Sequence, residues 1–189
     1  MLAALNTAQN LLAEFIADES NLNEIRQIAE ELVACFDNGN KVLICGNGGS
    51  STDAMHFAEE CTGRFRSHRK ALPAIALTDS SHITCVGNDY GFDEIFARGV
   101  QAFGKKGDLL IALSTSGNSG NIIRAIEQAE EQEVKTVALL GKNGGKLLDK
   151  CNFQLVIQGE TSDRIQEIHM LILHILIEQV ERIKFPENY

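Results

Sequence analysis

The stretch GDLLIALSTSGNS, residues 107–119, decides the fold of this 189-residue chain. Its apolar run predicts a buried strand, and the small polar residues that follow predict a turn into a helix. The same pattern, an apolar run followed by small polar residues, recurs in KVLICGNGGSS, residues 41–51. Further apolar strands are expected in ALPAIALT, VKTVALLG and FQLVIQG, which are residues 71–78, 134–141 and 153–159. Helical patterns lie between and around the strands, at residues 2–18, 22–38, 52–62, 92–103, 121–132, 146–150 and 163–184.

Short, continuous apolar strands that alternate with helices are typical of a parallel sheet covered on both faces. The predicted fold class is therefore α/β, a doubly wound five-stranded parallel sheet flanked by helices. We expect a single domain over residues 1–189, with N-terminal helices at 1–38, an α/β core at 40–160 and a C-terminal helix at 163–185. Ligands of such sheets bind at the carboxyl ends of the strands, where the two polar turns lie.

The composition excludes several classes of protein. The net charge is −9, from 17 basic and 26 acidic residues, and no basic run exceeds two residues, so nucleic-acid binding is not expected. No apolar stretch approaches the ~18 residues that a membrane span needs. The N-terminus lacks a basic start and carries acidic residues early, unlike a signal peptide. The five cysteines form no CxxC pair, which favours reduced thiols and a cytoplasmic location.

The turn that follows residue 113 carries four hydroxyl groups and one glycine before the next helix. Backbone N–H groups and Ser or Thr hydroxyls at a helix start are donors that hold a phosphate group, whereas capping needs only one hydroxyl. Lys and Arg are absent from this turn, which favours a single phosphate over a triphosphate with its metal. The expected phosphate-binding residues are Ser114, Thr115, Ser116 and Ser119.

The other polar turn, residues 46–51, has the spacing of a GxGxxG loop in part only. Ser51 replaces the third glycine, and no acidic residue ends a second strand about 20 residues further on, so a dinucleotide site is disfavoured. No Gly-Lys-Ser/Thr follows, which excludes a Walker loop. Two interpretations stay open with equal weight: a ligand-binding turn whose glycines let the backbone approach, and a tight turn capped by Ser50.

Two segments carry side chains suited to metal binding or acid–base chemistry. His56 and Glu60 of AMHFAEE lie four residues apart, on one face of a helix, although this spacing also arises by chance on solvated faces. His174 lies in the apolar stretch LILHILI, where a core histidine bonded to a backbone carbonyl is the simpler interpretation. Gln166 has a plain explanation as the fourth residue of an Asp163-x-x-Gln166 cap.

Taken together, the pattern NGGSS…DAMHFAEE…GND…STSGNS…DRIQEIH…H resembles the phosphoheptose isomerases of the sugar isomerase (SIS) domain family, over nearly the whole chain. The resemblance implies a ketose–aldose isomerase that converts sedoheptulose 7-phosphate to D-glycero-D-manno-heptose 7-phosphate through an enediol. This reaction is the first step towards nucleotide-activated heptose for lipopolysaccharide. The resemblance also implies a homotetramer and one Zn²⁺ per subunit, bound by His56, Glu60, Gln166 and His174.

The resemblance assigns further roles to single residues. Glu60 is the implied general base, and His174 is the implied acid. Besides the phosphate-binding turn, substrate contacts are expected from Asn47, Gly48, Gly49, Asn88, Asp89 and Gln166.

Spacing along the last helix bears on how such a site is assembled. His169 and His174 are five residues apart, about 140° around a helix, and therefore cannot share one face. Gln166 and His174 are eight residues apart, about 12 Å along the axis, so both reach one ion only under strain. Ligands or walls from two chains avoid that strain. We therefore expect the N- and C-terminal helices to form an oligomer interface with active sites at subunit boundaries.

A non-catalytic SIS-domain scaffold that binds the replication initiator protein is the alternative function. Such proteins resemble this chain through a GNG…S turn, an STSGNS-like turn and RIQE, and the tail KFPENY, residues 184–189, is somewhat like theirs. They lack the His/Glu pair and the final His, so His56, Glu60 and His174 favour the enzyme. A phosphosugar-sensing regulator is less favoured, because the sequence shows no separate DNA-binding segment.

Overall fold

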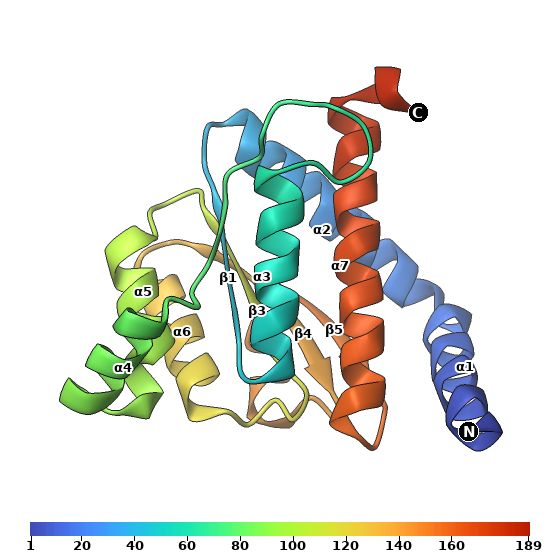
Figure 1. Cartoon of the computed structure of the whole chain (residues 1–189), viewed down its shortest axis with the longest axis horizontal. Helices are drawn as coiled ribbons and strands as arrows, with labels where there is room; N and C mark the ends of the chain where they lie inside the picture. The colour runs from blue at the N-terminus through green and yellow to red at the C-terminus, as the bar shows by residue number, and fades with distance from the viewer.

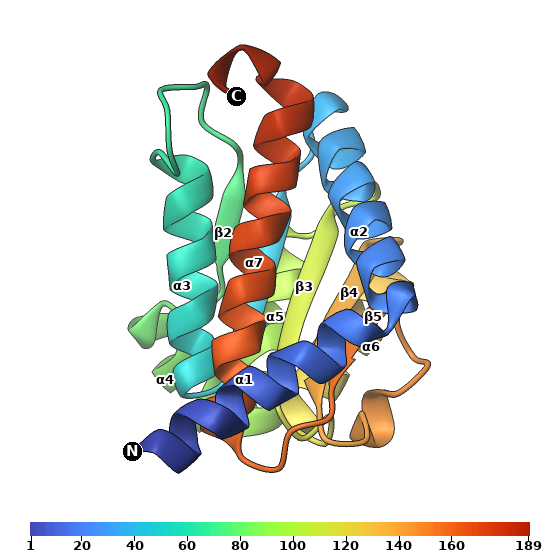
Figure 2. The same ribbon diagram turned by 90° about the vertical axis from the view of Figure 1, so that its right-hand side faces the viewer.

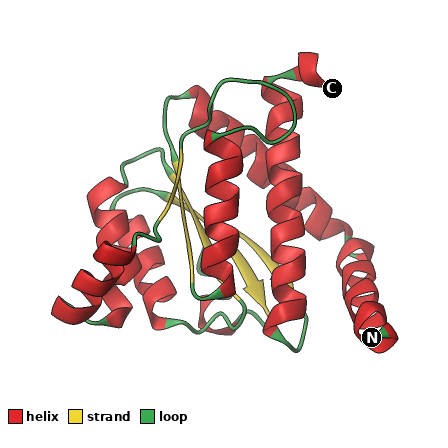
Figure 3. Ribbon diagram, viewed as in Figure 1, coloured by secondary structure: helices red, strands yellow, loops and turns green.

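A five-stranded parallel sheet lies between two layers of helices in the computed structural model, which describes all residues from Met1 to Tyr189 (Figures 1 and 3). The strand order is β2-β1-β3-β4-β5, and every pair of neighbours is parallel. The predicted doubly wound α/β fold is thereby confirmed. The strands are β1 (Val42–Gly46), β2 (Ala74–Ala76), β3 (Leu109–Ser114), β4 (Lys135–Gly141) and β5 (Phe153–Ile157).

Each face of the sheet has its own apolar core, because successive side chains of a strand point to opposite faces. Along β3, Ile111 and Leu113 join the core of one face, and Leu110 joins the core of the other. The first face is covered by α1 (Leu2–Ala17), α2 (Glu19–Asp37), α3 (Gly49–Thr62) and α7 (Ser162–Lys184), as Figure 2 shows. The second face is covered by α4 (Ser80–Asp89), α5 (Ile95–Phe103) and α6 (Gly120–Glu131). None of these helices combines the length and the apolarity that crossing a bilayer requires.

Helix starts differ from the sequence-based expectations for identifiable reasons. α2 begins three residues early because the Asp18 carboxylate accepts a hydrogen bond from the Ser20 N–H at 2.9 Å and so caps the helix. α3 also begins three residues early, at Gly49, and its N-cap is Gly48 with φ +57°. The interpretation of Ser50 as the N-cap is therefore wrong, since Ser50 lies inside the first turn and is buried.

α4 is the one long element that the sequence patterns do not predict. Its sequence, SSHITCVGND, contains β-branched residues and a glycine, which are weak helix formers. The helix forms because Asp79 caps it, accepting from the His82 N–H at 2.7 Å, and because Val86 packs into the core of the second face. The remaining departures are small: β2 is short, residues 145–147 form a 3₁₀ turn (η2) instead of a helix at 146–150, and two further 3₁₀ turns are η1 (Phe92–Glu94) and η3 (Pro186–Asn188).

The connection from α3 to β2, residues 63–73, passes over the ends of α3 and α7 that point away from the carboxyl edge of the sheet (Figure 1). The chain terminus after α7 folds back towards this connection. Both segments therefore lie at the far ends of the two helices that carry the predicted metal ligands.

Candidate active site

The two polar turns lie side by side at the carboxyl edge of the sheet. One follows β1 and the other follows β3, and these neighbouring strands mark the point where the strand order reverses, which is where open α/β sheets bind ligands. Asn47 in the first turn and Asn121 at the start of α6 exchange two amide hydrogen bonds, each 2.8 Å long. This pair ties the turns together and occupies the Asn47 side chain, so the contact of Asn47 with a sugar stays a prediction.

The turn at residues 114–119 has a fixed shape. Gly117 has φ +63°, and a Cβ at this position would collide with the carbonyl oxygen of Gly144. The Leu147 N–H donates to the Gly117 carbonyl at 3.1 Å, and the Ser114 hydroxyl accepts from the Gly117 N–H at 3.1 Å. The connection after β4 thus supports the turn from outside, and a ligand would meet a preformed loop.

The hydroxyl groups of this turn are not used to cap the helix behind it. Ser119 is the N-cap residue of α6, yet its side chain makes no capping hydrogen bond and lies 3.5 Å from the Ser114 hydroxyl. The Ser116 hydroxyl accepts from the Asn118 N–H at 3.2 Å, and the Thr115 hydroxyl lies 3.1 Å from that of Ser162. A cluster of hydroxyls in front of a helix start is suited to a phosphate group. We keep the assignment of this turn as a prediction.

His56 and Glu60 of α3 and His174 of α7 form one cluster between the two helices. One ligand atom of each lies within 4.8 Å of the others. The Nε2 atom of His56 is 3.3 Å from Oε1 of Glu60, and the His56 and His174 rings meet edge to face with centroids 5.0 Å apart. The cluster forms because α3 and α7 run side by side and both start at the carboxyl edge of the sheet (Figures 1 and 2).

The surroundings of this cluster suit both a metal ion and proton transfer. The side chains of His56 and Glu60 are 44% and 17% exposed, so the cluster is open on one side. Phe65 stacks on His174 with ring centroids 5.8 Å apart. Burial, and then the proximity of His56, lowers the pKa of His174, which favours the neutral imidazole that binds metals. Two imidazoles and one carboxylate are a donor set that Zn²⁺ accepts, with a further position left for water or substrate.

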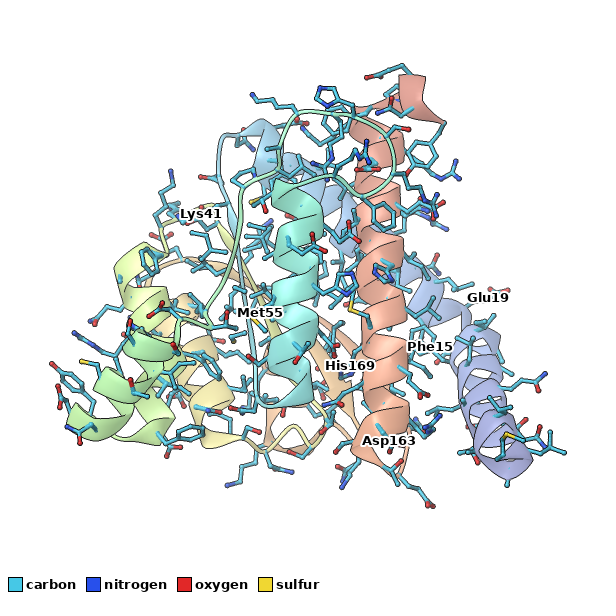
Figure 4. The ribbon with its side chains drawn as sticks, in the orientation of Figure 1. Phe15, Glu19, Lys41, Met55, Asp163 and His169 are labelled. Atoms are coloured by element: carbon cyan, nitrogen blue, oxygen red, sulfur yellow. The ribbon has the colours of Figure 1, made fainter.

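Gln166 lies apart from this cluster within one chain. Its amide nitrogen donates to the Ser50 hydroxyl at 3.3 Å, and a Cβ at Gly49 would lie 2.6 Å from its Oε1. Along α7 it stands about 12 Å from His174. The proposed Asp163-x-x-Gln166 cap is wrong, because Thr161 is the N-cap of α7 and Asp163 lies in its first turn (Figure 4). Gln166 as a metal ligand stays a prediction.

Asn88 and Asp89 also lie far from the cluster in one chain. They end α4, are exposed, and are joined by a 2.7 Å hydrogen bond between their side chains. α4 packs mainly on α5 and η1, on the face of the sheet opposite α7 (Figure 1). One chain therefore does not bring these residues to His56, Glu60 and His174.

His169 is the core histidine of α7. Its side chain is 0% exposed, and its Nε2 lies 3.0 Å from the Leu140 carbonyl oxygen in β4 (Figure 4). The interpretation as a core histidine bonded to a backbone carbonyl, which was considered for His174, thus applies to His169, on a different face of α7. Burial lowers the pKa of His169 to about 4.

This buried histidine predicts a pH dependence of stability. An unfolded chain protonates His169 near pH 6.5 but the folded chain only near pH 4, so the unfolded state holds more protons between these values. The free energy of unfolding should therefore fall by about 3 kcal/mol as the pH drops from 6.5 to 4. Thermal unfolding of wild type and His169→Gln across this range measures the effect, since the variant should lack this component. An identical pH slope in both proteins would contradict it.

Three residues near the site are missed by sequence patterns. Asn121 holds Asn47, Phe65 stacks on His174, and Asp53 lies one turn before His56 with a buried carboxylate oxygen that has no hydrogen-bond partner. Burial raises the pKa of Asp53. Only Asp53 carries a signal in the sequence, which is its position three residues before His56 on the same helix.

Comparison with known proteins identifies the family. The family described as "SIS domain" matches residues 5–141. A phosphoheptose isomerase of Fusobacterium nucleatum subsp. nucleatum is 58% identical over 189 residues, which cover 100% of this chain and 97% of that protein. The chain belongs to the phosphoheptose isomerases.

Solved structures agree with this family assignment. The phosphoheptose isomerase of Neisseria gonorrhoeae superposes with a TM-score of 0.87 at 38% identity, covering 95% of this chain and 96% of that one. A phosphoheptose isomerase of Francisella tularensis gives the same TM-score of 0.87 and 38% identity, with 95% of both chains covered. As a phosphoheptose isomerase, the protein is an aldose–ketose isomerase. The replication scaffold is not favoured, because these relatives are named as enzymes and His56, Glu60 and His174 meet in one cluster.

Proposed function

We propose that this phosphoheptose isomerase converts sedoheptulose 7-phosphate to D-glycero-D-manno-heptose 7-phosphate, the first step towards nucleotide-activated heptose for lipopolysaccharide. The observation that carries the proposal is the meeting of Glu60, His56 and His174 in one open cluster. The test is incubation of the purified chain with sedoheptulose 7-phosphate and detection of the aldose by NMR. Absence of the aldose at equilibrium would contradict the proposal.

The proposed chemistry needs one base and one group that moves protons at oxygen. Isomerisation removes a proton from C1 of the ketose, forms an enediol and returns a proton to C2. Glu60 is the proposed base: its carboxylate is largely shielded from water, so a captured proton can return to the substrate. His174 is the proposed acid, which moves protons between the O1 and O2 oxygens. Phe65 against its ring limits the orientations that this imidazole can take.

We also propose one Zn²⁺ per subunit, held by His56, Glu60 and His174. The ion would polarise the oxygens of the substrate as a Lewis acid. Gln166 completes the proposed ligand set, and since it contacts Ser50 in its own chain, we propose that a second subunit supplies it. The two imidazoles and the carboxylate within 4.8 Å of one another support this assignment.

We propose that the phosphate of the substrate binds in the turn after β3. The sugar would lie against the turn after β1, along Asn47 and the backbone of Gly48 and Gly49. The hydroxyls of Ser114, Thr115, Ser116 and Ser119 would accompany the N–H groups at the start of α6. Asn88 and Asp89 are exposed and would meet the hydroxyls of a substrate bound mainly by another subunit.

Replacing Ser119 by Ala is expected to raise KM while leaving the fold intact. The variant would lose a charge-assisted hydrogen bond to the phosphate. The loss costs about 1–3 kcal/mol of binding free energy, which raises KM about 5- to 150-fold. α6 should keep its stability, because the Ser119 hydroxyl makes no capping hydrogen bond to it. Ser20→Ala is the matched control, because that hydroxyl at the start of α2 contacts only Asp18. An unchanged KM in Ser119→Ala would place the phosphate elsewhere.

We propose that the chain works as a single domain, residues 1–189, in a homotetramer with active sites at subunit boundaries. Large apolar side chains are exposed on the helices of the first face, among them Leu2, Leu5 and Ile16 of α1, Met55 of α3, and Leu171 and Ile183 of α7. Such surfaces are typical of association sites. Sedimentation tests this proposal, since a mass of one 20.7 kDa chain would contradict it. The free cysteines support a cytoplasmic location.

A further inference from the structure

A fully buried ion pair joins the two helices that carry the reacting groups. Arg69, in the connection after α3, donates from Nε to Oε1 of Glu181 on α7 at 2.7 Å, and both side chains are 0% exposed. A buried pair of this kind requires further hydrogen bonds to both partners, because each charge has left water. The remaining bonds of Arg69 and Glu181 show what the pair fixes.

Arg69 uses its other nitrogens to hold the last turn of α3. Nη2 donates to the backbone carbonyl of Glu60 at 2.6 Å, and Nη1 donates to the carbonyls of Cys61 and Gly63 at 2.8 and 3.2 Å. The last carbonyls of a helix have no partners within it, and this end would otherwise be free to fray. The guanidinium therefore fixes the backbone of the proposed base itself.

Glu181 connects the same contact to His174. It lies seven residues after His174, two turns along the same face of α7. Its second oxygen, Oε2, accepts from the Tyr189 hydroxyl at 3.0 Å. The Tyr189 ring is covered by Arg182 and Arg66, at 4.4 and 5.7 Å from its centroid. The last residue of the tail thus completes the partners of the buried pair.

The tail also holds the connection that carries Phe65. The Asn188 amide donates to the His68 carbonyl at 3.2 Å, and Arg66 lies 5.1 Å from the Phe65 centroid. Phe65 in turn stacks on His174. Two series of contacts therefore link the tail to the site indirectly. One runs through Glu181 and Arg69 to the backbone of Glu60, and the other runs through the connection and Phe65 to His174.

We propose that Arg69, Glu181 and the C-terminal Tyr189 are positioning residues that set the placement of Glu60 relative to His174. This inference rests on the proposed function and deepens it. It gives the tail a role in positioning the reacting groups of its own chain, separate from any partner protein.

The test compares two variants that remove the cation from a fully buried carboxylate. Arg69→Gln removes it from Glu181, and Lys41→Gln removes it from Asp108, whose side chain is also 0% exposed but lies at the amino ends of β1 and β3. Both should lower the unfolding temperature. At a temperature where both are folded, Arg69→Gln should lower kcat about ten-fold or more with KM within about two-fold, whereas Lys41→Gln should keep the wild-type kcat. Equal losses of kcat, or none in Arg69→Gln, would overturn the proposal.

Tyr189→Phe keeps the inference testable if Arg69→Gln does not fold. The variant retains the ring and its arginine contacts and loses only the hydroxyl that Glu181 accepts from. We expect kcat to fall about three-fold with KM unchanged, and an unchanged kcat would overturn the proposal.

A zinc titration separates this inference from the proposed function. Wild-type protein that does not turn over the heptose phosphate would contradict the function alone. The Zn²⁺ affinity, measured by competition with a fluorescent chelator, still tests the positioning role. Arg69→Gln should weaken Zn²⁺ binding about ten-fold, while Lys41→Gln should leave it unchanged. Equal Zn²⁺ affinities in all three proteins would overturn it.

Discussion

A Glu60→Gln variant is expected to lose turnover by a factor of about 10²–10⁴, the usual cost of removing a general base. The amide keeps the shape of the side chain and an oxygen that can face a metal, but it cannot accept the proton from C1. Phosphosugar binding should persist, because the turn at residues 114–119 is untouched. Steady-state kinetics and a binding measurement with the same substrate check both expectations.

Glu130→Gln is the matched control for this experiment, since Glu130 is an exposed residue of α6 on the other face of the sheet. It should retain wild-type kcat. His174→Gln should lose turnover in the same range as Glu60→Gln if it moves protons at oxygen. Undiminished kcat in Glu60→Gln would mean that another group is the base.

Removal of the metal is expected to abolish most of the activity. Purified protein should contain about one zinc per chain, and a chelator should remove both the zinc and the turnover, which added Zn²⁺ should restore. His56→Ala should bind less than a tenth of this zinc, about the loss expected when one of the few ligands is removed. Elemental analysis of both proteins provides the measurement.

The control for the metal experiment is His68→Ala, because the His68 side chain is exposed and lies outside the cluster. Its zinc content should match the wild type. Full turnover by protein without zinc would contradict the metal assignment. The acid–base roles of Glu60 and His174 are tested separately, by Glu60→Gln and His174→Gln.

The sheet and most helices could be predicted from the sequence because their signal is local. A run such as LLIALS is apolar on both sides of the strand, as is typical of a parallel sheet buried between two helix layers. α4 could not be predicted in this way. Its residues are weak helix formers, and the helix depends on the Asp79 cap and on packing of Val86, which is a tertiary effect.

From residue spacing, the site could be predicted only for residues that share one face of the same helix. The pair His56 and Glu60 follows from four-residue spacing, but spacing along α7 cannot say that His174 turns to α3 while His169 turns to β4. That choice depends on where α7 packs. Gln166 and Asp89 lie on other elements, and the contribution that we propose for them from a second subunit is one that no pattern within one sequence describes.

The amide pair between Asn47 and Asn121 has a consequence for the thermodynamics of ligand capture. Because this pair joins the two turns across β1 and β3 through the protein's own hydrogen bonds, a ligand need not order them. Ordering a flexible loop normally opposes association through lost conformational entropy. Capture of the sugar phosphate should therefore resemble docking to a rigid surface, with a small entropic penalty and little change in hydrogen exchange at either turn.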